Sequence, residues 1–397
     1  MKDNTLYRNF FNYVGQTSTA PLAIQIENAK GVFLYAKDKN YIDCISGIGV
    51  SNIGHGNPQV IEAIKHQAEL HLHLMVYGEM IQAPQVNLAQ KLASNLPSTL
   101  NNVYYVNSGS EAIEGAMKLA KRYTGKSNFV AQKLAYHGGT HGALSLMSDS
   151  YFSQKFVPLL TGISFINQNK IEEINEIIND RTAAVFIEPI MGEIGYEPCT
   201  LDYLTAIRKR CTEVGALLIF DEIQSGFGRS GSLFSFMQFN ITPDVLVLAK
   251  SLGGGMPLGC FIASKDIMGV LMDNPVLGHI NTFGGHPISC AAALAALTFI
   301  LDHNLAEKAI EKEQFFRERL KHPKIINISG KGLMLALHFE DKIFCRKVID
   351  TCIENGLLID WFLYAEDRIR LAPPLIIEQE QITQVCNIIL ESIDQNI

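Results

Sequence analysis

The sequence predicts an α/β fold, with a large, mostly parallel sheet of seven strands and a smaller α+β lobe. Between positions 103 and 263, short apolar runs alternate with longer helical patterns, which is typical of parallel strands joined by crossover helices. After His286-Pro287 the pattern changes to shorter strands and helices. The length of 397 residues exceeds that of one typical domain, so a second lobe is expected.

Seven runs in the first region are the candidate strands of the sheet. They are rich in β-branched and aromatic residues, and helical patterns at 111–123, 171–178 and 201–214 lie between several of them. Strands of a sheet that is covered on both faces form such continuous apolar runs. The candidate strands are 103–106, 128–131, 162–166, 183–187, 216–220, 244–248 and 258–263.

The smaller lobe is predicted from both ends of the chain. Helical patterns run from Pro287 to 301 and over 306–320, 344–355 and 379–392, with strand-like runs at 325–328, 333–339, 357–359 and 369–371. Near the N-terminus, the runs 32–35 and 41–44 flank the turn residues 38–40, which favours a hairpin that packs with this lobe. The predicted domains are an N-terminal segment at 1–50, the large domain at 51–290 and the small domain at 291–397.

Composition and charge argue against several classes of protein. Hydrophobic residues make up 47% and charged residues 18% of the chain, which is typical of a compact globular protein and not of a disordered one. The net charge of −7 gives no support to binding of nucleic acid or of anionic membranes. The longest nearly apolar stretch, 288–301, has 14 residues, which is too short to span a bilayer.

The cysteines indicate a reducing compartment. All eight are scattered without a Cys-x-x-Cys pair or a metal-ligand spacing, so we expect free thiols and no metal site. Residues 1–5 lead into no apolar core of the signal-peptide type. We therefore expect a soluble protein of the cytoplasm.

Lys250 stands at the end of the apolar run 245–249, directly before a glycine-rich segment. The end of a buried strand can desolvate an ammonium group, which lowers its pKa and leaves a neutral amine able to attack a carbonyl and form a Schiff base. The alternative is a lysine that extends its charge into water. Ligand sites in open parallel sheets lie beyond the carboxyl ends of the strands, which favours the catalytic interpretation.

Asp221 ends the apolar run 216–220 in the same way. A carboxylate at the tip of a buried strand needs a partner, because its desolvation is costly. A protonated pyridine nitrogen is a suitable partner, and a capping or salt-bridging aspartate is the alternative. Asp221 precedes Lys250 by 29 residues, which is enough for one crossover, so the two side chains can face each other across neighbouring strands.

The segment Ser108-Gly109-Ser110 follows another strand and opens the helical pattern 111–123. Backbone amides and hydroxyls at a helix start suit a phosphate, although simple capping of the helix by Ser108 or Ser110 is the commoner use of such residues. Other candidate polar or aromatic side chains follow further strands or lie in a glycine-rich loop, namely Tyr136, His137, Glu188, Glu193 and Thr282.

A competing motif is the Gly-x-Gly-x-x-Gly pattern at 226–231, which follows a strand and raises a nicotinamide-dependent oxidoreductase as an alternative. The segment 232–236 is a poor helix opening, and no acidic residue ends a strand about 20 residues further on, as a dinucleotide site requires. The match is therefore interpreted as accidental.

Six motifs occur in a fixed order along the chain. They are Asn-Ser-Gly-Ser-Glu-Ala at 107–112, Tyr-His-Gly at 136–138, Glu-Pro-Ile-Met-Gly-Glu at 188–193, Phe-Asp-Glu-Ile-Gln-Ser-Gly-Phe-Gly-Arg-Ser-Gly at 220–231, Ala-Lys-Ser-Leu-Gly-Gly-Gly at 249–255 and Thr-Phe-Gly-Gly-His-Pro at 282–287. Together they resemble the class III, or ω-, aminotransferases, which are fold-type I enzymes that use pyridoxal 5′-phosphate (PLP). The resemblance runs from 54–58 to 370–374 and is strongest to the acetylornithine and ornithine aminotransferase branch.

The resemblance implies a role for each candidate residue. Lys250 bonds to the cofactor aldehyde and moves the substrate proton, and Asp221 pairs with the pyridine nitrogen. A substrate carboxylate binds Arg370, with which Glu193 pairs when another substrate is present. In this family the loop that carries Thr282 reaches the phosphate of a neighbouring subunit, which implies a homodimer. The remaining cofactor contacts are Gln224 at the ring hydroxyl, Tyr136 stacked on the ring, Ser108, Gly109 and Ser110 at the phosphate, and His137 and Glu188.

One departure from the family concerns substrate choice. Acetylornithine, ornithine and 4-aminobutyrate enzymes carry a carboxylate-binding arginine just after the His-Gly that follows the stacking aromatic, and here Ala143 follows His141-Gly142. Alanine cannot form a bidentate pair with a carboxylate, so the donor stays open. We expect transamination from an ω-amino acid, an ornithine-type amino acid or a diamine to a 2-oxo acid. The alternatives are an aminomutase or epimerase of the same fold, the oxidoreductase, and a protein that holds the cofactor without catalysis.

Overall fold

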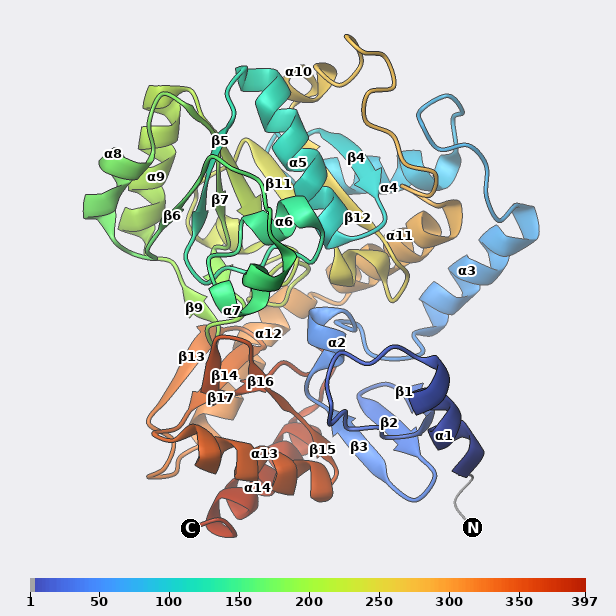
Figure 1. Ribbon diagram of the computed structural model, residues 1–397. Helices are drawn as coiled ribbons and strands as arrows, with labels where there is room; N and C mark the ends of the chain where they lie inside the picture. Colours follow the sequence, from blue (N-terminus) through green and yellow to red (C-terminus); the bar gives the residue numbers. More distant parts are fainter. Residues whose placement is uncertain (1–3) are drawn as a thin grey trace.

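A computed structural model describes residues 4–397, and the expectation about the N-terminal residues falls partly on 1–3, outside the described residues. The upper half of Figure 1 is built on a seven-stranded sheet with the order β4-β12-β11-β10-β7-β5-β6. All seven predicted strands are confirmed, with ends that differ by no more than one residue. Their bounds are β4 Asn102–Val106, β5 Asn128–Gln132, β6 Ile163–Ile166, β7 Thr182–Ile187, β10 Leu217–Asp221, β11 Val245–Leu248 and β12 Gly259–Ala263.

The sheet is mostly parallel, as predicted. β5 pairs in parallel with β6 and β7, and β10 pairs in parallel with β7 and β11. Only β12 runs against its neighbours β11 and β4. β4, β5, β7, β10 and β11 therefore all end at the same edge of the sheet, where ligands bind in folds of this class.

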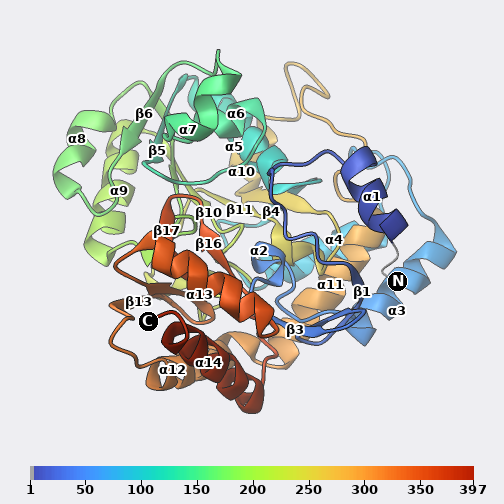
Figure 2. The same cartoon turned by 60° about the horizontal axis from the view of Figure 1, so that its bottom comes forward.

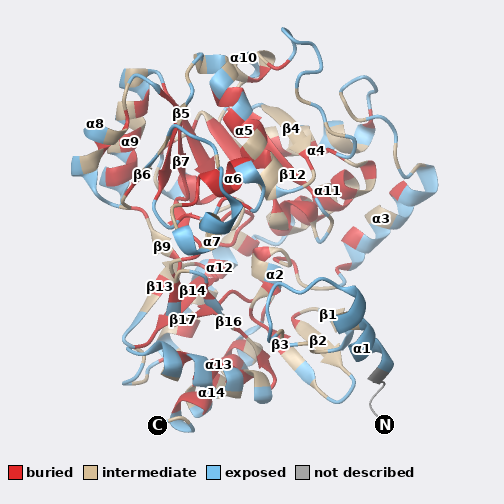
Figure 3. Ribbon diagram, in the orientation of Figure 1, coloured by how far each residue is buried: buried red, intermediate tan, exposed pale blue. Residues whose placement is uncertain are grey.

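Alternate residues of the strands point to opposite faces of the sheet and build two cores. In β5, Phe129 and Ala131 belong to one buried cluster, whereas Val130 belongs to the other. The helices α5 (Gly109–Thr124), α6 (His141–Ser145) and α10 (Lys265–Gly269) contribute to the first cluster, and α9 (Leu201–Val214) and α11 (Pro287–Asp302) contribute to the second. Figure 3 shows the buried strands between helices whose outer faces are exposed. The α/β fold class is confirmed.

Two helices precede the sheet in a region for which the sequence predicted no element. α3 (Pro58–Leu70) starts with Asn57, whose side chain accepts hydrogen bonds from the backbone amides of Gln59 and Val60. This is a standard N-cap followed by proline in the first turn. α4 (Ala83–Ala93) also has a proline in its first turn, and both helices pack against α11.

The other helices are short or lie near the ends of the chain. They are α1 Asn4–Tyr13, α2 Ser46–Gly49, α7 Ser150–Ser153, α8 Ile174–Ile177, α12 Leu305–Arg319, α13 Lys342–Glu354 and α14 Gln379–Asp394, with 3-10 turns at η1 Gln154–Phe156, η2 Ile171–Glu173, η3 Ser235–Gln238 and η4 Lys250–Gly253. The predicted helices 287–301, 306–320, 344–355 and 379–392 correspond to α11, α12, α13 and α14.

Two further four-stranded sheets lie below the large one (Figures 1 and 2). The first joins β1 (Ile26–Lys30), β2 (Phe33–Ala36) and β3 (Asn40–Asp43) to β15 (Leu357–Leu358), so an N-terminal strand pairs with a C-terminal one. The second has the order β13-β14-β17-β16, with β13 Asn327–Lys331, β14 Met334–His338, β16 Asp360–Phe362 and β17 Ala365–Leu371. The sequence did not predict β16. The domain limits at 50 and 290 stay a prediction.

Among residues 4–397 no single helix has the length and apolar character needed to cross a membrane, while the bent pair Pro287–Asp302 and Leu305–Arg319 meets both requirements when the two helices are taken together. No group of three or more His, Cys, Asp or Glu side chains suited to a metal ion occurs within the same residues.

Candidate active site

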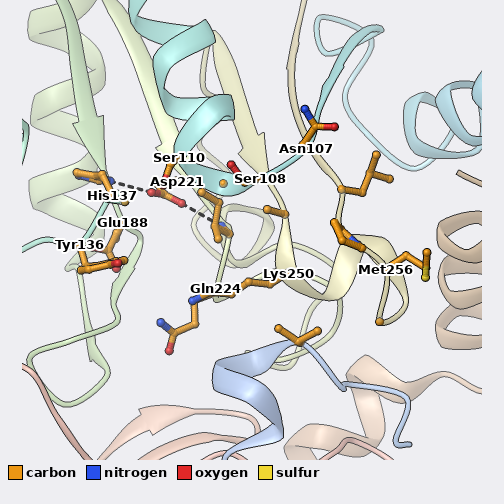
Figure 4. A pocket seen from close by; sticks show the side chains of 18 residues that line it. Asn107, Ser108, Ser110, Tyr136, His137, Glu188, Asp221, Gln224, Lys250 and Met256 are labelled. Atoms are coloured by element: carbon orange, nitrogen blue, oxygen red, sulfur yellow. Dashed lines mark hydrogen bonds and ion pairs between the residues drawn. The ribbon is translucent and has the colours of Figure 1, made fainter. Parts of the chain in front are cut away.

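A cavity of about 360 Å³ lies at the edge of the sheet where the parallel strands end (Figure 4). Its volume is in the range of small-molecule sites. After β7, the chain forms a small antiparallel pair of strands, β8 (Ile190–Met191) and β9 (Glu197–Pro198). The cavity wall contains nine of the predicted site residues, which are Ser108, Gly109, Ser110, Tyr136, His137, Glu188, Asp221, Gln224 and Lys250.

Lys250 and Asp221 enter this cavity from neighbouring strands. Asp221, the last residue of β10, lies opposite Val247 of β11, and Lys250 follows Val247 by three residues. The backbone of Lys250 has a φ of 50°, which is uncommon for a residue with a side chain and must be held in place by the surrounding structure. The predicted juxtaposition of the two side chains in one cavity is therefore observed in the structure.

The amine of Lys250 is available for chemistry. In the part of the chain that the structure describes, it forms no hydrogen bond or ion pair. Burial is the largest influence on its pKa and lowers it below the usual value, although Glu193 and Asp221 act in the opposite direction. An amine with a lowered pKa is neutral in a larger fraction of molecules and can attack a carbonyl.

Asp221 is held by His137, a contact that the sequence did not reveal. His137 Nδ1 lies 2.7 Å from Asp221 Oδ2, and the Ile223 amide donates to Asp221 Oδ1 at 3.0 Å. Burial lowers the pKa of His137, but its hydrogen bond to Asp221 and the charges of Asp221 and Glu188 outweigh burial and raise it. Asp221 is therefore fixed from two sides, as the dashed lines in Figure 4 show.

Glu188 fixes the aromatic residue on the opposite wall. The backbone amide of Tyr136 donates to Glu188 Oε1 at 2.8 Å, and the amide of Gly192 donates to Glu188 Oε2 at 2.7 Å. Burial raises the pKa of Glu188 to about 7. The Tyr136 side chain stays open to the cavity, with 39% of the residue exposed, so its ring can stack on a planar ligand.

The start of α5 forms the third wall. The Ser108 hydroxyl accepts a hydrogen bond from the Glu111 amide at 3.2 Å, so the capping alternative holds for Ser108. A Cβ atom at Gly109 would lie 2.9 Å from Ile223, and one at Gly138 would lie 2.2 Å from Ser110 Oγ. Glycine at both positions keeps the backbone amides of the helix start accessible, which suits an anion.

Glu222, next to Asp221, points away from the cavity and holds the loop that follows β10. It is fully buried and accepts hydrogen bonds from the Ser225 hydroxyl at 2.9 Å and the Ser235 and Phe236 amides at 2.7 and 2.6 Å. This loop contains the glycine pattern 226–231. Between this pattern and β11, the described residues form one element, the 3-10 turn Ser235–Gln238. The helix that a dinucleotide fingerprint requires does not follow, which removes support from the oxidoreductase alternative.

Arg370 lies beside the cavity wall and forms a buried ion pair with Glu193. Arg370 Nη2 donates to both carboxylate oxygens of Glu193, at 3.1 and 2.9 Å, and Nη1 donates to Gln224 Oε1 at 3.3 Å. Burial raises the pKa of Glu193, but the charge of Arg370 and its hydrogen bonds outweigh burial and hold it below the usual value. Gln224, which lines the cavity, connects this ion pair to the cavity.

A family model for class-III aminotransferases matches residues 14–393. The chain belongs to the class-III aminotransferases. Acetylornithine aminotransferase of Methanosarcina acetivorans is 40% identical to it over 358 residues, which are 88% of this chain and 87% of the relative. The structure of ornithine aminotransferase from Toxoplasma gondii is 30% identical, with a TM-score of 0.90, and the match covers 98% of this chain and 93% of that one.

The name of a third relative indicates a different substrate. The structure of adenosylmethionine-8-amino-7-oxononanoate aminotransferase from Methanocaldococcus jannaschii is 28% identical to this chain, with a TM-score of 0.91 and coverage of 99% of both chains. Close structural similarity therefore extends to aminotransferases with different named substrates.

Class-III aminotransferases depend on PLP, and the cavity of this aminotransferase fits that cofactor. Lys250 supplies an amine without a partner in the described chain, and Asp221 supplies a carboxylate on the neighbouring strand. The glycine-lined start of α5 leaves room for a phosphate, since side chains at Gly109 and Gly138 would close it. The cavity thus offers groups for an aldehyde, a ring nitrogen and a phosphate.

Two predicted positions lie away from the cavity wall of the aminotransferase. Thr282 is exposed in the segment before α11, so within one subunit it does not line the cavity. Ala143 is fully buried in the core cluster that α5 covers, and the prediction that it marks the missing arginine needs correction. Gly139, which directly follows His137-Gly138, meets no atom within 4 Å of an added Cβ, so the open position beside the cavity is Gly139.

Proposed function

We propose that the enzyme transfers an amino group, by a ping-pong mechanism, from an ω-amino acid, an ornithine-type amino acid or a diamine to a 2-oxo acid. The observation that carries the proposal is the pair formed by the unpartnered Lys250 amine and the Asp221 carboxylate in one cavity. In ping-pong transfer the donor product leaves before the acceptor binds, so a single cavity serves both substrates in turn.

The residues of the chain divide the work among them. Bound PLP supplies an aldehyde that accepts the amino group and a ring that delocalises the electron pair of the substrate carbon. Lys250 Nζ would hold the aldehyde and, as a free amine, would carry the proton that leaves the substrate carbon. Asp221 would hold the ring nitrogen, with His137 behind it. Tyr136 would stack on the ring, and Ser108, Gly109 and Ser110 would bind the phosphate.

Glu193 and Arg370 are proposed to act as a switch between the two substrates. With the pair closed, Arg370 is neutralised and a substrate end without a carboxylate can approach. With Glu193 displaced, Arg370 can bind the carboxylate beside the keto group of the acceptor in a bidentate geometry. The connection of Arg370 to Gln224 at the cavity wall supports this proposal.

The function is tested by mixing the PLP-bound enzyme with one amine at a time and following the visible absorbance as the cofactor takes up the amino group. The panel is ornithine, acetylornithine, lysine, 4-aminobutyrate, putrescine, glutamate and alanine. Glutamate is expected to react at least about tenfold more slowly than the best ω-amine, because Gly139 offers no partner for its distal carboxylate. Glutamate as the fastest donor would contradict this expectation.

The second half of the test uses a 2-oxo acid after the amine has reacted. Return of the original spectrum with formation of an amino acid is the expected result and identifies net transfer. If no amine changes the spectrum, the aminotransferase proposal fails. A donor that is converted to an isomer without any 2-oxo acid would identify the aminomutase or epimerase alternative instead.

We propose that the enzyme is a homodimer in which Thr282 contacts the phosphate bound by the partner subunit. Exposed apolar side chains gather on two adjoining segments, 72–81 and 276–283, among them Ile81 at 96% and Phe283 at 53% exposure. The segments adjoin because the rings of His73 and Phe283 lie 4.9 Å apart. Sedimentation should give about twice the chain mass of 44.0 kDa. A fully active monomer would exclude the shared site.

A cytoplasmic location is also proposed. All eight cysteines are buried and none forms a disulfide, which is in keeping with a reducing compartment. Fractionation of cells that express a tagged enzyme tests this location, and recovery of the activity outside the cytoplasm would exclude it.

A further inference from the structure

Arg370 has a second carboxylate partner, Asp360, which no motif of the sequence indicates. β16 and β17 pair so that Asp360 lies directly opposite Arg370. Arg370 Nε is 3.0 Å from Asp360 Oδ1, and the Arg370 side chain is 1% exposed. The two atoms are close but poorly aligned for a hydrogen bond, so the contact is mainly an attraction of charges. One buried guanidinium therefore lies between two carboxylates, Glu193 and Asp360.

The cluster of Arg370, Glu193 and Asp360 has a surplus of negative charge. One cation, Arg370, directly contacts two acids, Glu193 and Asp360. Burial, which outweighs the charge of Arg370, raises the pKa of Asp360 to about 6. At neutral or higher pH both carboxylates are thus mainly ionised, and the cluster carries about one net negative charge.

This cluster adjoins the cavity. Arg370 Nη1 bonds to Gln224, which lines the cavity. Glu193 and Arg370 are also close enough to Lys250 to act on its pKa, in opposite directions. A substrate end that contacts Arg370 therefore meets Asp360 behind the guanidinium even after Glu193 has moved away, because Asp360 is held in a strand and not in a loop.

We propose that Asp360 sets the substrate preference at the Arg370 end of the cavity. It favours a substrate whose end there is an ammonium group and weakens the binding of one whose end there is a carboxylate. The inference deepens the proposed transamination and rests on it. A carboxylate that replaces Glu193 still shares Arg370 with Asp360, whereas an ammonium end is attracted by the surplus negative charge. Asp360 acts through Arg370 and is a positioning residue.

The test compares the PLP-bound wild-type enzyme with Asp360→Asn, Asp360→Glu and the surface control Asp350→Asn, whose side chain is 57% exposed on α13. Three quantities are measured for each protein at pH 8. They are the dissociation constant of butyrate, which has a carboxylate but no amino or keto group, the concentration of putrescine that half-saturates the first half-reaction, and the concentration of pyruvate that half-saturates the second.

Asp360→Asn is expected to bind butyrate about tenfold more tightly, to need about tenfold less pyruvate and to need more putrescine, because one negative charge beside Arg370 is lost. The limiting rate constants of both half-reactions should stay near those of the wild type. Asp360→Glu keeps the charge and should restore the wild-type preference, and Asp350→Asn should match the wild type.

Two outcomes overturn the inference. One is an Asp360→Asn enzyme whose butyrate, pyruvate and putrescine constants are unchanged. The other is an enzyme in which all three constants weaken together, as expected if Asp360 only supports the local structure. Butyrate binding does not depend on catalysis, so a wild-type enzyme that reacts with no amine would refute the proposed function while butyrate still reports on Asp360.

Discussion

Replacement of Lys250 by alanine is expected to abolish turnover, lowering kcat by at least about 10³-fold, and to remove the visible absorbance of lysine-bound PLP. The Lys250 amine has no partner among the described residues, and it lies in the same cavity as Asp221. Without it, neither the covalent attachment of the cofactor nor the proton transfer at the substrate carbon has a group to perform it. Absorbance spectra and steady-state rates with the best amine measure both effects.

The matched control for this variant is Lys209→Ala, because the Lys209 side chain is 78% exposed on α9 and distant from the cavity wall. It should retain wild-type activity and absorbance. Thermal unfolding should show that the Lys250→Ala protein is folded, since the substitution removes a buried amine that forms no hydrogen bond or ion pair with the described residues. A folded Lys250→Ala enzyme with full activity would overturn the assignment of Lys250.

Replacement of Asp221 by asparagine is expected to lower the rate of the first half-reaction by about 10²-fold or more while the visible absorbance of the lysine-bound cofactor remains. Asparagine has nearly the same shape and can keep a hydrogen bond with His137, but it lacks the charge that holds a proton on the ring nitrogen. The loss of charge should also lower the raised pKa of His137, because its hydrogen bond to Asp221 and the charge of Asp221 oppose the effect of burial.

The combination of retained absorbance and slowed chemistry separates Asp221→Asn from Lys250→Ala. Asp202→Asn, at an exposed position in the first turn of α9, is the matched control and should react at the wild-type rate. If the Asp221→Asn enzyme completes the first half-reaction as fast as the wild type, Asp221 does not supply the charge opposite the ring nitrogen.

Much of the fold could be predicted from the sequence because the central strands are buried on both faces. A strand such as Leu217–Asp221 is buried at every position, so it forms a continuous apolar run that ends where the polar site begins. The separation of 29 residues between Asp221 and Lys250 then allows them to lie on neighbouring strands. For this reason the sequence could predict that the two side chains share one cavity.

Elements with few buried residues left a weaker signal. In α3 only Val60 and Gln67 are fully buried, and in α4 only Leu88 and Leu92. So narrow an apolar stripe does not predict a helix, since these helices are stabilised by packing on α11. The position of β13 was likewise predicted two residues too early, because only one of its five residues is buried.

Two contacts between distant segments could not be predicted from the sequence. His137 and Asp221 are 84 residues apart and meet only because β5 and β10 flank β7. Asp360 meets Arg370 through the register of the three-residue strand β16. The apolar run 357–362 with one internal aspartate was the available signal, but it does not identify the partner.

We propose that Lys250 and Asp221 hold opposite ends of one PLP molecule. A crystal structure of the PLP-bound enzyme is the decisive test. We predict a covalent bond from Lys250 Nζ to the aldehyde carbon, and a ring nitrogen about 3 Å from an Asp221 carboxylate oxygen. A cofactor bonded to another lysine, or a ring nitrogen that faces away from Asp221, would contradict the claim.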